Sequence, residues 1–273
     1  MAKKNHLFVY LLVFGVSFTS LSQNGNFTMG ARSAGMANAS TTLSDEWSSF
    51  NNIGGLSYVE SISVFATYRN QYEFPDFSTM AVGFVVPVFN GTATVGAFRF
   101  GDDLFNQQRV NLGFSNRFGI VSLGANVSYY QVSIQEGGTG NAFLFDFGGH
   151  AKLSEQFYFA AHISNLNQAE ISEITSERVP TYMKAGISYR PINQLMLNTE
   201  LEKSIDEDVN LKLGLEYEIV NKVFIRSGII TEPFMSHFGM GFDPGRLAVD
   251  YAYSNHSELG GIHQFSFIYR IKK

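Results

Sequence analysis

A strict alternation of apolar and polar side chains, clearest between residues 193 and 230, constrains this chain more than any other feature. Leu195, Leu197 and Leu201 share one parity, and the pattern returns over residues 211–219 with lysine and glutamate on the opposite parity. Period-two alternation indicates strands, because successive side chains point to opposite faces of a sheet. The runs are about ten residues long, the length of a tilted strand that crosses a bilayer. The sequence therefore predicts an all-β fold, a transmembrane antiparallel β-barrel.

The same unit repeats from residue 61 onward, and it predicts about 14 strands. We expect them at residues 61–69, 78–88, 92–101, 108–118, 120–132, 143–153, 156–165, 181–190, 194–202, 208–219, 222–231, 234–242, 246–254 and 262–271. Long connections alternate with short turns, which is typical of an outer-membrane barrel with its longer loops outside the cell. The long connections are expected at residues 70–77, 102–107, 133–142 and 165–180.

Composition agrees with a barrel and excludes other classes. Charged residues make up 16% of the chain, against roughly 25% in soluble globular proteins. Aromatic residues reach 15%, and there are 26 glycines and no cysteine. The formal net charge of −5 comes without a basic patch, so no nucleic-acid partner is expected. The absence of cysteine excludes disulfide bonds and a lipidated cysteine.

Sorting each strand by parity separates an apolar face from a charged one. The apolar parity carries almost no ionisable residue, with His263 as the main exception. We expect it to face lipid, because an arginine or lysine there would cost about 2–4 kcal/mol at the bilayer midplane. The other parity should line the lumen. Its candidate site residues are Arg69, Arg99, Arg109, Arg117, Glu200, Glu202, Lys212, Glu216, Glu218 and Arg226.

The lumen charges are unevenly distributed by sign. The first four strands contribute arginines, whereas the ninth and tenth contribute four glutamates and one lysine. One hypothesis is a transverse field across the lumen, or two charged walls that hold the amino-terminal segment through Arg32, Asp45 and Glu46. The alternative is that inward charges pair with their neighbours and solvate the interior.

The amino terminus has the pattern of a secretory signal peptide. Lys3 and Lys4 precede an apolar run over residues 7–18, and Ser20-Leu21-Ser22 forms a small-x-small cleavage site. The apolar run is too short to span a bilayer comfortably. We therefore assign residues 1–22 to a cleaved signal peptide.

Residues 23–58 differ in kind from the rest of the chain. They are rich in Gly, Ala, Ser and Asn and lack sustained alternation, so short helical turns or coil are expected. Such a segment either hangs free or enters the lumen as a hatch. Residues 59–273 then form the barrel.

Within that segment, a G-A-R-x-x-G-M-x-x-A pattern, a later acidic residue and N-x-x-G-L before the first strand resemble the amino-terminal signature of FadL-like outer-membrane proteins. The closer resemblance is to the PorV/PorQ group of Bacteroidetes-type bacteria. The matching positions are Gly30, Ala31, Arg32, Gly35, Met36, Ala39, Asp45, Asn52, Gly55 and Leu56. The chain departs from the family's N-P-A-G-L at Ile53, which replaces the proline and affects the local turn.

The resemblance implies two functions. PorV/PorQ-type barrels include accessory components of type IX secretion, so the first expectation is an interaction role beside secretion-system proteins in the outer membrane. The alternative is transport, because FadL-like proteins conduct hydrophobic small molecules past an amino-terminal hatch. Outer-membrane lipid is a partner in both cases, and a hydrophobic ligand in the second.

No residue pattern indicates enzymatic chemistry. The six histidines do not form a metal-ligand spacing. Ser, His and Asp are scattered, and no nucleophile elbow is present. We therefore expect no catalytic residue, metal site or cofactor.

Overall fold

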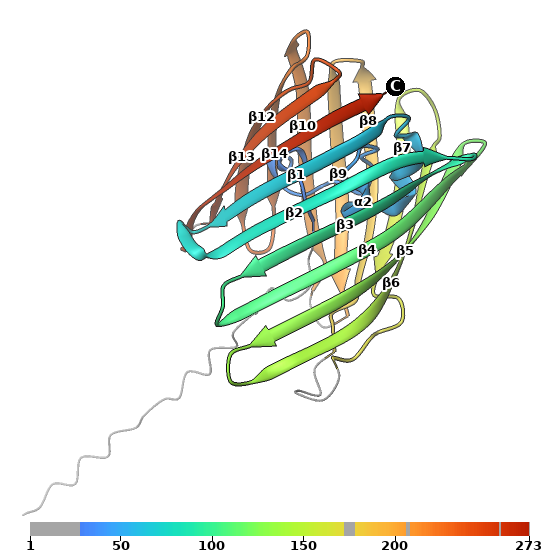
Figure 1. Cartoon of the computed structure of the whole chain (residues 1–273). Helices are drawn as coiled ribbons and strands as arrows, with labels where there is room; N and C mark the ends of the chain where they lie inside the picture. The colour runs from blue at the N-terminus through green and yellow to red at the C-terminus, as the bar shows by residue number, and fades with distance from the viewer. Residues whose placement is uncertain (1–27, 172–177, 206–207, 257, 273) are drawn as a thin grey trace, which may run out of the picture.

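A computed structural model of the chain describes residues 28–171, 178–205, 208–256 and 258–272. These residues form a closed barrel in which each strand pairs antiparallel with its sequence neighbours, and β14 returns to pair with β1 (Figure 1). The fourteen strands are β1 Ile62–Gln71, β2 Phe74–Val88, β3 Gly91–Gly101, β4 Phe105–Phe118, β5 Val121–Ile134, β6 Gly138–Lys152, β7 Phe157–Ser164, β8 Tyr182–Ile192, β9 Leu195–Ser204, β10 Asn210–Val220, β11 Val223–Ile230, β12 Met235–Phe242, β13 Leu247–His256 and β14 Gly260–Lys272. The predicted fold class and strand count are confirmed.

The two ends of the barrel differ. The start of β1 and the end of β14 pair with one another and define the near end, whereas the β7–β8 connection lies at the opposite, far end (Figure 1). Strands extend further towards the far end than predicted, so the first three long connections shrink to residues 72–73, 102–104 and 135–137. Backbone pairing continues there without apolar alternation, and only alternation marks a strand in the sequence.

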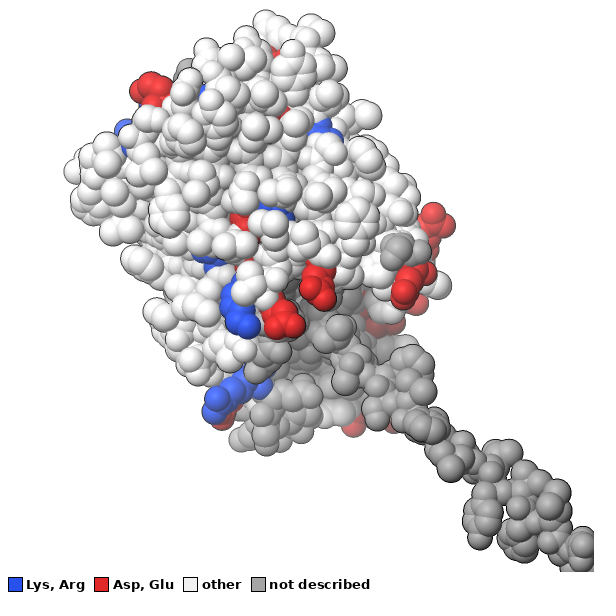
Figure 2. All heavy atoms as spheres, turned by 180° about the vertical axis from the view of Figure 1, so that it is seen from behind, with Lys and Arg blue, Asp and Glu red and all other residues white. Residues whose placement is uncertain are grey.

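The outer face of the barrel is apolar. In β6, Phe143, Phe145 and Phe147 are exposed, whereas Leu144 and Asp146 between them are buried. The same alternation recurs around the barrel, and uncharged side chains form a broad band in Figure 2, with most of the visible charges towards one end. So much contiguous apolar surface is unusual for a protein that meets water on all sides.

Residues 28–59, here called the inner segment, lie inside the barrel. The segment contains α1 Ala31–Gly35, α2 Ser48–Asn51 and the 3-10 helix η1 Ile53–Tyr58. Helix α1 contacts β11 to β14, whereas η1 contacts β3 to β7 on the other side of the lumen. Within the described residues, no helix is long and apolar enough to cross a membrane.

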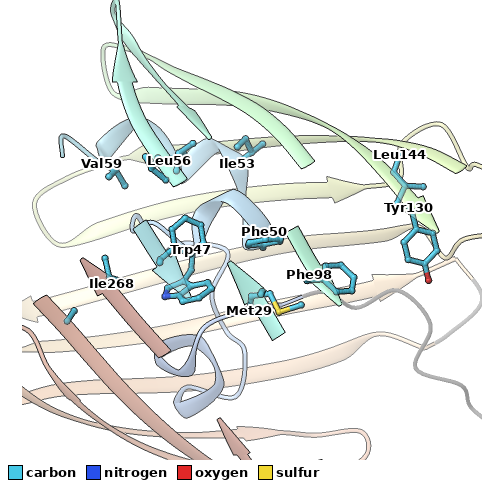
Figure 3. Close-up of a cluster of buried hydrophobic side chains, with 14 of the residues drawn as sticks. Met29, Trp47, Phe50, Ile53, Leu56, Val59, Phe98, Tyr130, Leu144 and Ile268 are labelled. Carbon is cyan, nitrogen blue, oxygen red and sulfur yellow. The ribbon is translucent and has the colours of Figure 1, made fainter. Parts of the chain in front are cut away.

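The inner segment and the strands share one hydrophobic core. Trp47, Phe50, Ile53 and Leu56 of the segment are buried in it, and strand side chains surround them (Figure 3). The rings of Trp47 and Phe65 meet edge to face with their centroids 4.7 Å apart. Burial of each large apolar side chain is worth about 1.5–3 kcal/mol, so this core stabilises the position of the segment.

Candidate functional site

The small residues of the amino-terminal motif lie where neighbouring atoms approach closely. Gly30 has a φ of +93°, and an added Cβ would lie 2.7 Å from the ring of Trp47. An added Cβ on Gly35 would lie 3.0 Å from the Cα atom of Gly239 in β12. Ala31 is completely buried. Larger side chains at these positions would push the segment away from the wall of the barrel.

Asn52 organises the second half of the motif. Its Nδ2 donates to the carbonyl of Thr41 at 2.7 Å, and its Oδ1 accepts from the backbone N–H of Gly54 at 3.1 Å. The side chain therefore caps η1 although the family's proline is missing. An added Cβ on Gly55 would collide with a backbone carbonyl of the same segment, and Leu56 is completely buried.

Inward-facing glycines of the barrel wall leave room for the inner segment. An added Cβ on Gly214 in β10 would lie 2.8 Å from the Cβ atom of Met36. One on Gly228 in β11 would lie 2.7 Å from the backbone nitrogen of Ala37. Backbone of the segment thus rests directly on backbone of the strands, which only glycine permits.

Two adjacent glycines of β6 provide a matched test of this packing. An alanine at Gly148 would collide with the Asn52 carboxamide, whereas one at Gly149 points to the outer face and meets a flexible leucine side chain at 3.3 Å. We expect Gly148→Ala to destabilise docking of the inner segment by about 1–3 kcal/mol and Gly149→Ala to leave it unchanged. Limited proteolysis of the folded barrel measures this, and equal cleavage of the two variants would contradict it.

An ion cluster joins α1 to the wall of the barrel. Arg32 donates to both oxygens of Glu216, with Nε at 2.8 Å and Nη2 at 2.6 Å, and to Asp45 at 3.0 Å. Arg226 donates to Glu216 at 2.6 Å and to Asp250 at 2.7 Å. The carboxylate of β10 is therefore neutralised by adjacent guanidinium groups rather than by cations across the lumen.

A second cluster lies on β8, β9 and β10. Lys212 lies 2.6 Å from Glu202 and 3.6 Å from Glu200, and Lys184 lies 3.1 Å from Glu202. Glu200 also accepts from the backbone N–H and the hydroxyl of Thr41, at 2.8 and 2.7 Å. All four charged side chains are buried. In this cluster the charged residues of adjacent strands pair with one another, and Glu200 also binds the inner segment. Both expected arrangements of the lumen charges therefore occur together.

The near end holds further predicted charges. Arg270 Nε donates to Glu46 at 2.8 Å, and its Nη1 donates to Asp243 at 2.9 Å. Arg117 and Glu218 keep the predicted inward parity, but they lie close to the mouth, where Arg117 is exposed and Glu218 is half-buried. Three acidic or basic residues of the segment, Arg32, Asp45 and Glu46, thus form ion pairs.

At the far end, Asn165 and Val179 of the β7–β8 connection contact groups in the interior of the barrel. Arg109 forms a buried ion pair with Asp146, which also accepts from the backbone N–H of Asn165 at 3.0 Å. The Asn165 side chain donates to the carbonyl of Val179 at 2.7 Å, and Val179 is buried in the core. Arg69 lies half-buried on the inward parity of β1.

The prediction that Arg99 lines the lumen is wrong. In β3, Thr94, Gly96 and Phe98 are buried and face inward, so Arg99 lies on the outer face with its side chain 52% exposed. The rule that charges face inward misplaced it, because both parities of β3 carry small or apolar residues. The inward position next to it is occupied by Phe98, which packs in the core.

Apolar side chains line part of the lumen beside the inner segment. Phe98, Tyr130 and Leu144 of the strands belong to one core cluster with Met29 and with Val179 of the β7–β8 connection. In Figure 3, Phe98 lies beside Met29 and Phe50 of the segment, whereas Tyr130 and Leu144 lie further along the strands. The region could accommodate a hydrophobic molecule only if the segment or the connection moved, because the side chains are packed together.

The inward histidines do not meet. His150 Nε2 lies 3.2 Å from the Ser44 hydroxyl and 3.2 Å from the Thr42 carbonyl, while His162 lies on the neighbouring strand β7. In the part of the chain that the structure describes, no group of three or more His, Cys, Asp or Glu residues is placed to hold a metal ion.

Comparison with known proteins finds a likeness in fold and none in sequence. No protein-family model matches the sequence, and no curated protein sequence matches it. The crystal structure of the toluene transporter TbuX of Ralstonia pickettii superposes with a TM-score of 0.69 at 11% identity, covering 90% of this chain and 99% of TbuX.

Two further solved structures superpose on the same barrel. A FadL homologue of Pseudomonas aeruginosa superposes with a TM-score of 0.64 at 12% identity, covering 91% of this chain and 99% of its own. The CymD monoaromatic hydrocarbon channel gives a TM-score of 0.67 at 12% identity, with 91% and 99% covered. At such identities the likeness concerns the fold alone, which is a closed barrel of fourteen antiparallel strands.

Proposed function

We propose that this protein is an outer-membrane channel for small hydrophobic molecules, with the inner segment as its hatch. The observation that carries the proposal is that Phe98, Tyr130 and Leu144 of the strands form one apolar cluster with Met29 of the inner segment. An apolar site with few polar groups is what a hydrophobic ligand requires. The fold likeness to toluene and hydrocarbon channels supports the same reading.

The apolar outer face supports location in a membrane. Outward side chains of adjacent strands form a belt of aromatic and aliphatic groups, which lipid would cover. Closed barrels satisfy every backbone group within the sheet, and that is the condition for crossing a bilayer with strands. The signal peptide at residues 1–22, which lies outside the described residues, would direct export.

Passage through the lumen requires movement of the inner segment. The segment lies buried in the interior and is tied to β9, β10 and β14 through Glu200, Glu216 and Arg270. Neither these polar contacts nor the shared hydrophobic core belongs to the strand ladder, so the segment can move without disturbing the strand pairing. The segment would therefore open and close an otherwise rigid barrel.

The interaction role in type IX secretion, expected from the resemblance to PorV/PorQ, stays a prediction. The structural comparisons favour the transport alternative, since the similar structures are transporters and channels. Secretion-system proteins that co-purify with the barrel in mild detergent would support the interaction role instead.

Hydrocarbon uptake tests the proposed function. The protein would be expressed in a host that lacks its own hydrocarbon channel, and entry of radiolabelled toluene would be measured. We expect Leu144→Asn to lower uptake about tenfold, because an amide that is unpaired in an apolar site costs about 1–3 kcal/mol, while Leu144→Met retains it. A shift in gel migration on heating verifies that both variants form barrels. Uptake no higher than in the empty host would refute the proposal.

A further inference from the structure

A groove of about 820 Å³ crosses the outer face of the barrel over β13, β14, β1, β2, β3 and β4. Its floor follows from the strand register. Ala66 pairs with Val82, which pairs with Ala97, so two short side chains lie in one row across three strands. Phe267 and Val110 continue this row at its two ends.

Larger side chains form both edges of the groove. Towards the far end, the adjacent row contains Phe265, Tyr68 and Met80, followed by Arg99 in β3. Towards the near end, the row after the alanines contains larger residues again. These are Tyr269, Val64, Phe84, Val95 and Leu112. The two alanines therefore create a depression between two raised rows.

Arg99 brings a positive charge to the far-end edge of this apolar groove. It lies two residues before the end of β3, and its guanidinium is 3.4 Å from both the Asp103 carboxylate and the Asp102 carbonyl. Asp103 is fully exposed, and contacts of that length between exposed groups contribute little. A guanidinium has five donors, so it can bind a further anion in a bidentate manner.

We propose that the groove binds an anionic membrane phospholipid, whose head group carries a net negative charge. An acyl chain lies over Ala66 and Ala97, between the two raised rows, and the phosphate accepts hydrogen bonds from Arg99 near the far end of β3. Charge complementarity identifies the occupant, since a guanidinium at one edge of an apolar groove matches an anionic head group above an acyl chain. The volume lies in the range of sites that hold ligands of this size. The proposal rests only on the membrane location of the proposed function and not on transport.

Lipid retention in nanodiscs tests the proposal. The full-length mature protein would be placed in nanodiscs that contain equal amounts of phosphatidylglycerol and phosphatidylcholine, and lipids retained after mild extraction would be counted by native mass spectrometry. We expect phosphatidylglycerol to be retained about fivefold over phosphatidylcholine, because the choline cation leaves that head group without net charge and an exposed ion pair is worth about this factor. Arg99→Gln should abolish the preference, and Ala97→Phe should abolish retention of both lipids.

Two control variants separate this groove from the rest of the outer face. Lys203→Gln removes an outward-facing cation of β9, and Ala125→Phe enlarges an outward-facing alanine of β5. Both should retain the preference for phosphatidylglycerol. Equal retention of the two lipids by the wild type, or the same loss in the controls, overturns the proposal. Toluene uptake measured in parallel distinguishes this outcome from failure of the transport function, which Arg99→Gln should leave intact.

Discussion

Replacing Arg32 by alanine is expected to release the inner segment and to open the barrel to small ions. The substitution leaves Glu216 with Arg226 as its remaining cation in the cluster, while Asp45 and Asp250 are also buried. Removing one partner of a buried ion pair costs about 3 kcal/mol at the lower end of the measured range. The lower end applies because the Arg32 side chain retains 27% of its exposure.

A change of that size shifts the balance between docked and released segment about a hundredfold, since each 1.4 kcal/mol is a factor of ten. Single-channel conductance in planar bilayers reports the release, and we expect Arg32→Ala to conduct far more often than the wild type. Cleavage of the segment by an added protease should rise in parallel. The barrel itself should survive, because Arg32 belongs to none of its strands.

Two variants control this experiment. Arg32→Lys keeps the charge but loses the two-pronged contact with Glu216, so it should fall between wild type and Arg32→Ala. Arg178→Ala breaks the Arg178–Glu170 pair, whose side chains are 66% and 63% exposed; an exposed pair contributes at most about 1 kcal/mol. Identical conductance of Arg32→Ala and Arg178→Ala would show that the ion cluster does not hold the segment.

The barrel was predictable from the sequence because every strand must place apolar side chains on the outer face. Side chains such as Leu213, Leu215 and Tyr217 all face outward, and one rule of alternation describes them. Strand ends were less predictable, since pairing beyond the apolar band needs only backbone groups. Arg99 was misplaced for a related reason, because its strand has no consistently polar parity.

The inner segment could be recognised but not placed. Its composition indicated a segment unlike the strands, and parity put Glu216 in the lumen. The pairing of Arg32 with Glu216 depends on the path of a segment that has no periodicity, so the sequence carries no signal for it. The same holds for Gly214 and Gly228. Glycine is unfavourable inside a strand, and the packing of Met36 and Ala37 against these two glycines cannot be read from the sequence.

An arginine placed on the outer face of β10 tests whether that face of the barrel meets lipid. Glu216 faces inward and is paired, whereas Leu215 faces outward at the middle of the strand. We expect Leu215→Arg to destabilise the protein in lipid vesicles by about 2–4 kcal/mol, because a cation at the bilayer midplane loses its hydration without gaining a partner. Reversible urea unfolding from large vesicles measures this difference.

Ile219→Arg is the matched control, since it places the same side chain on the same face of β10 near the end of the strand. Its cost should fall to about 0–1 kcal/mol, as is typical close to the membrane interface. Leu215→Phe should be nearly neutral because it stays apolar. If the outer face met water instead, Leu215→Arg would change stability by no more than about 0.5 kcal/mol, the usual range for surface substitutions. A large difference between positions 215 and 219 therefore requires a low-dielectric environment around the middle of the barrel, and equal effects at both positions would exclude it.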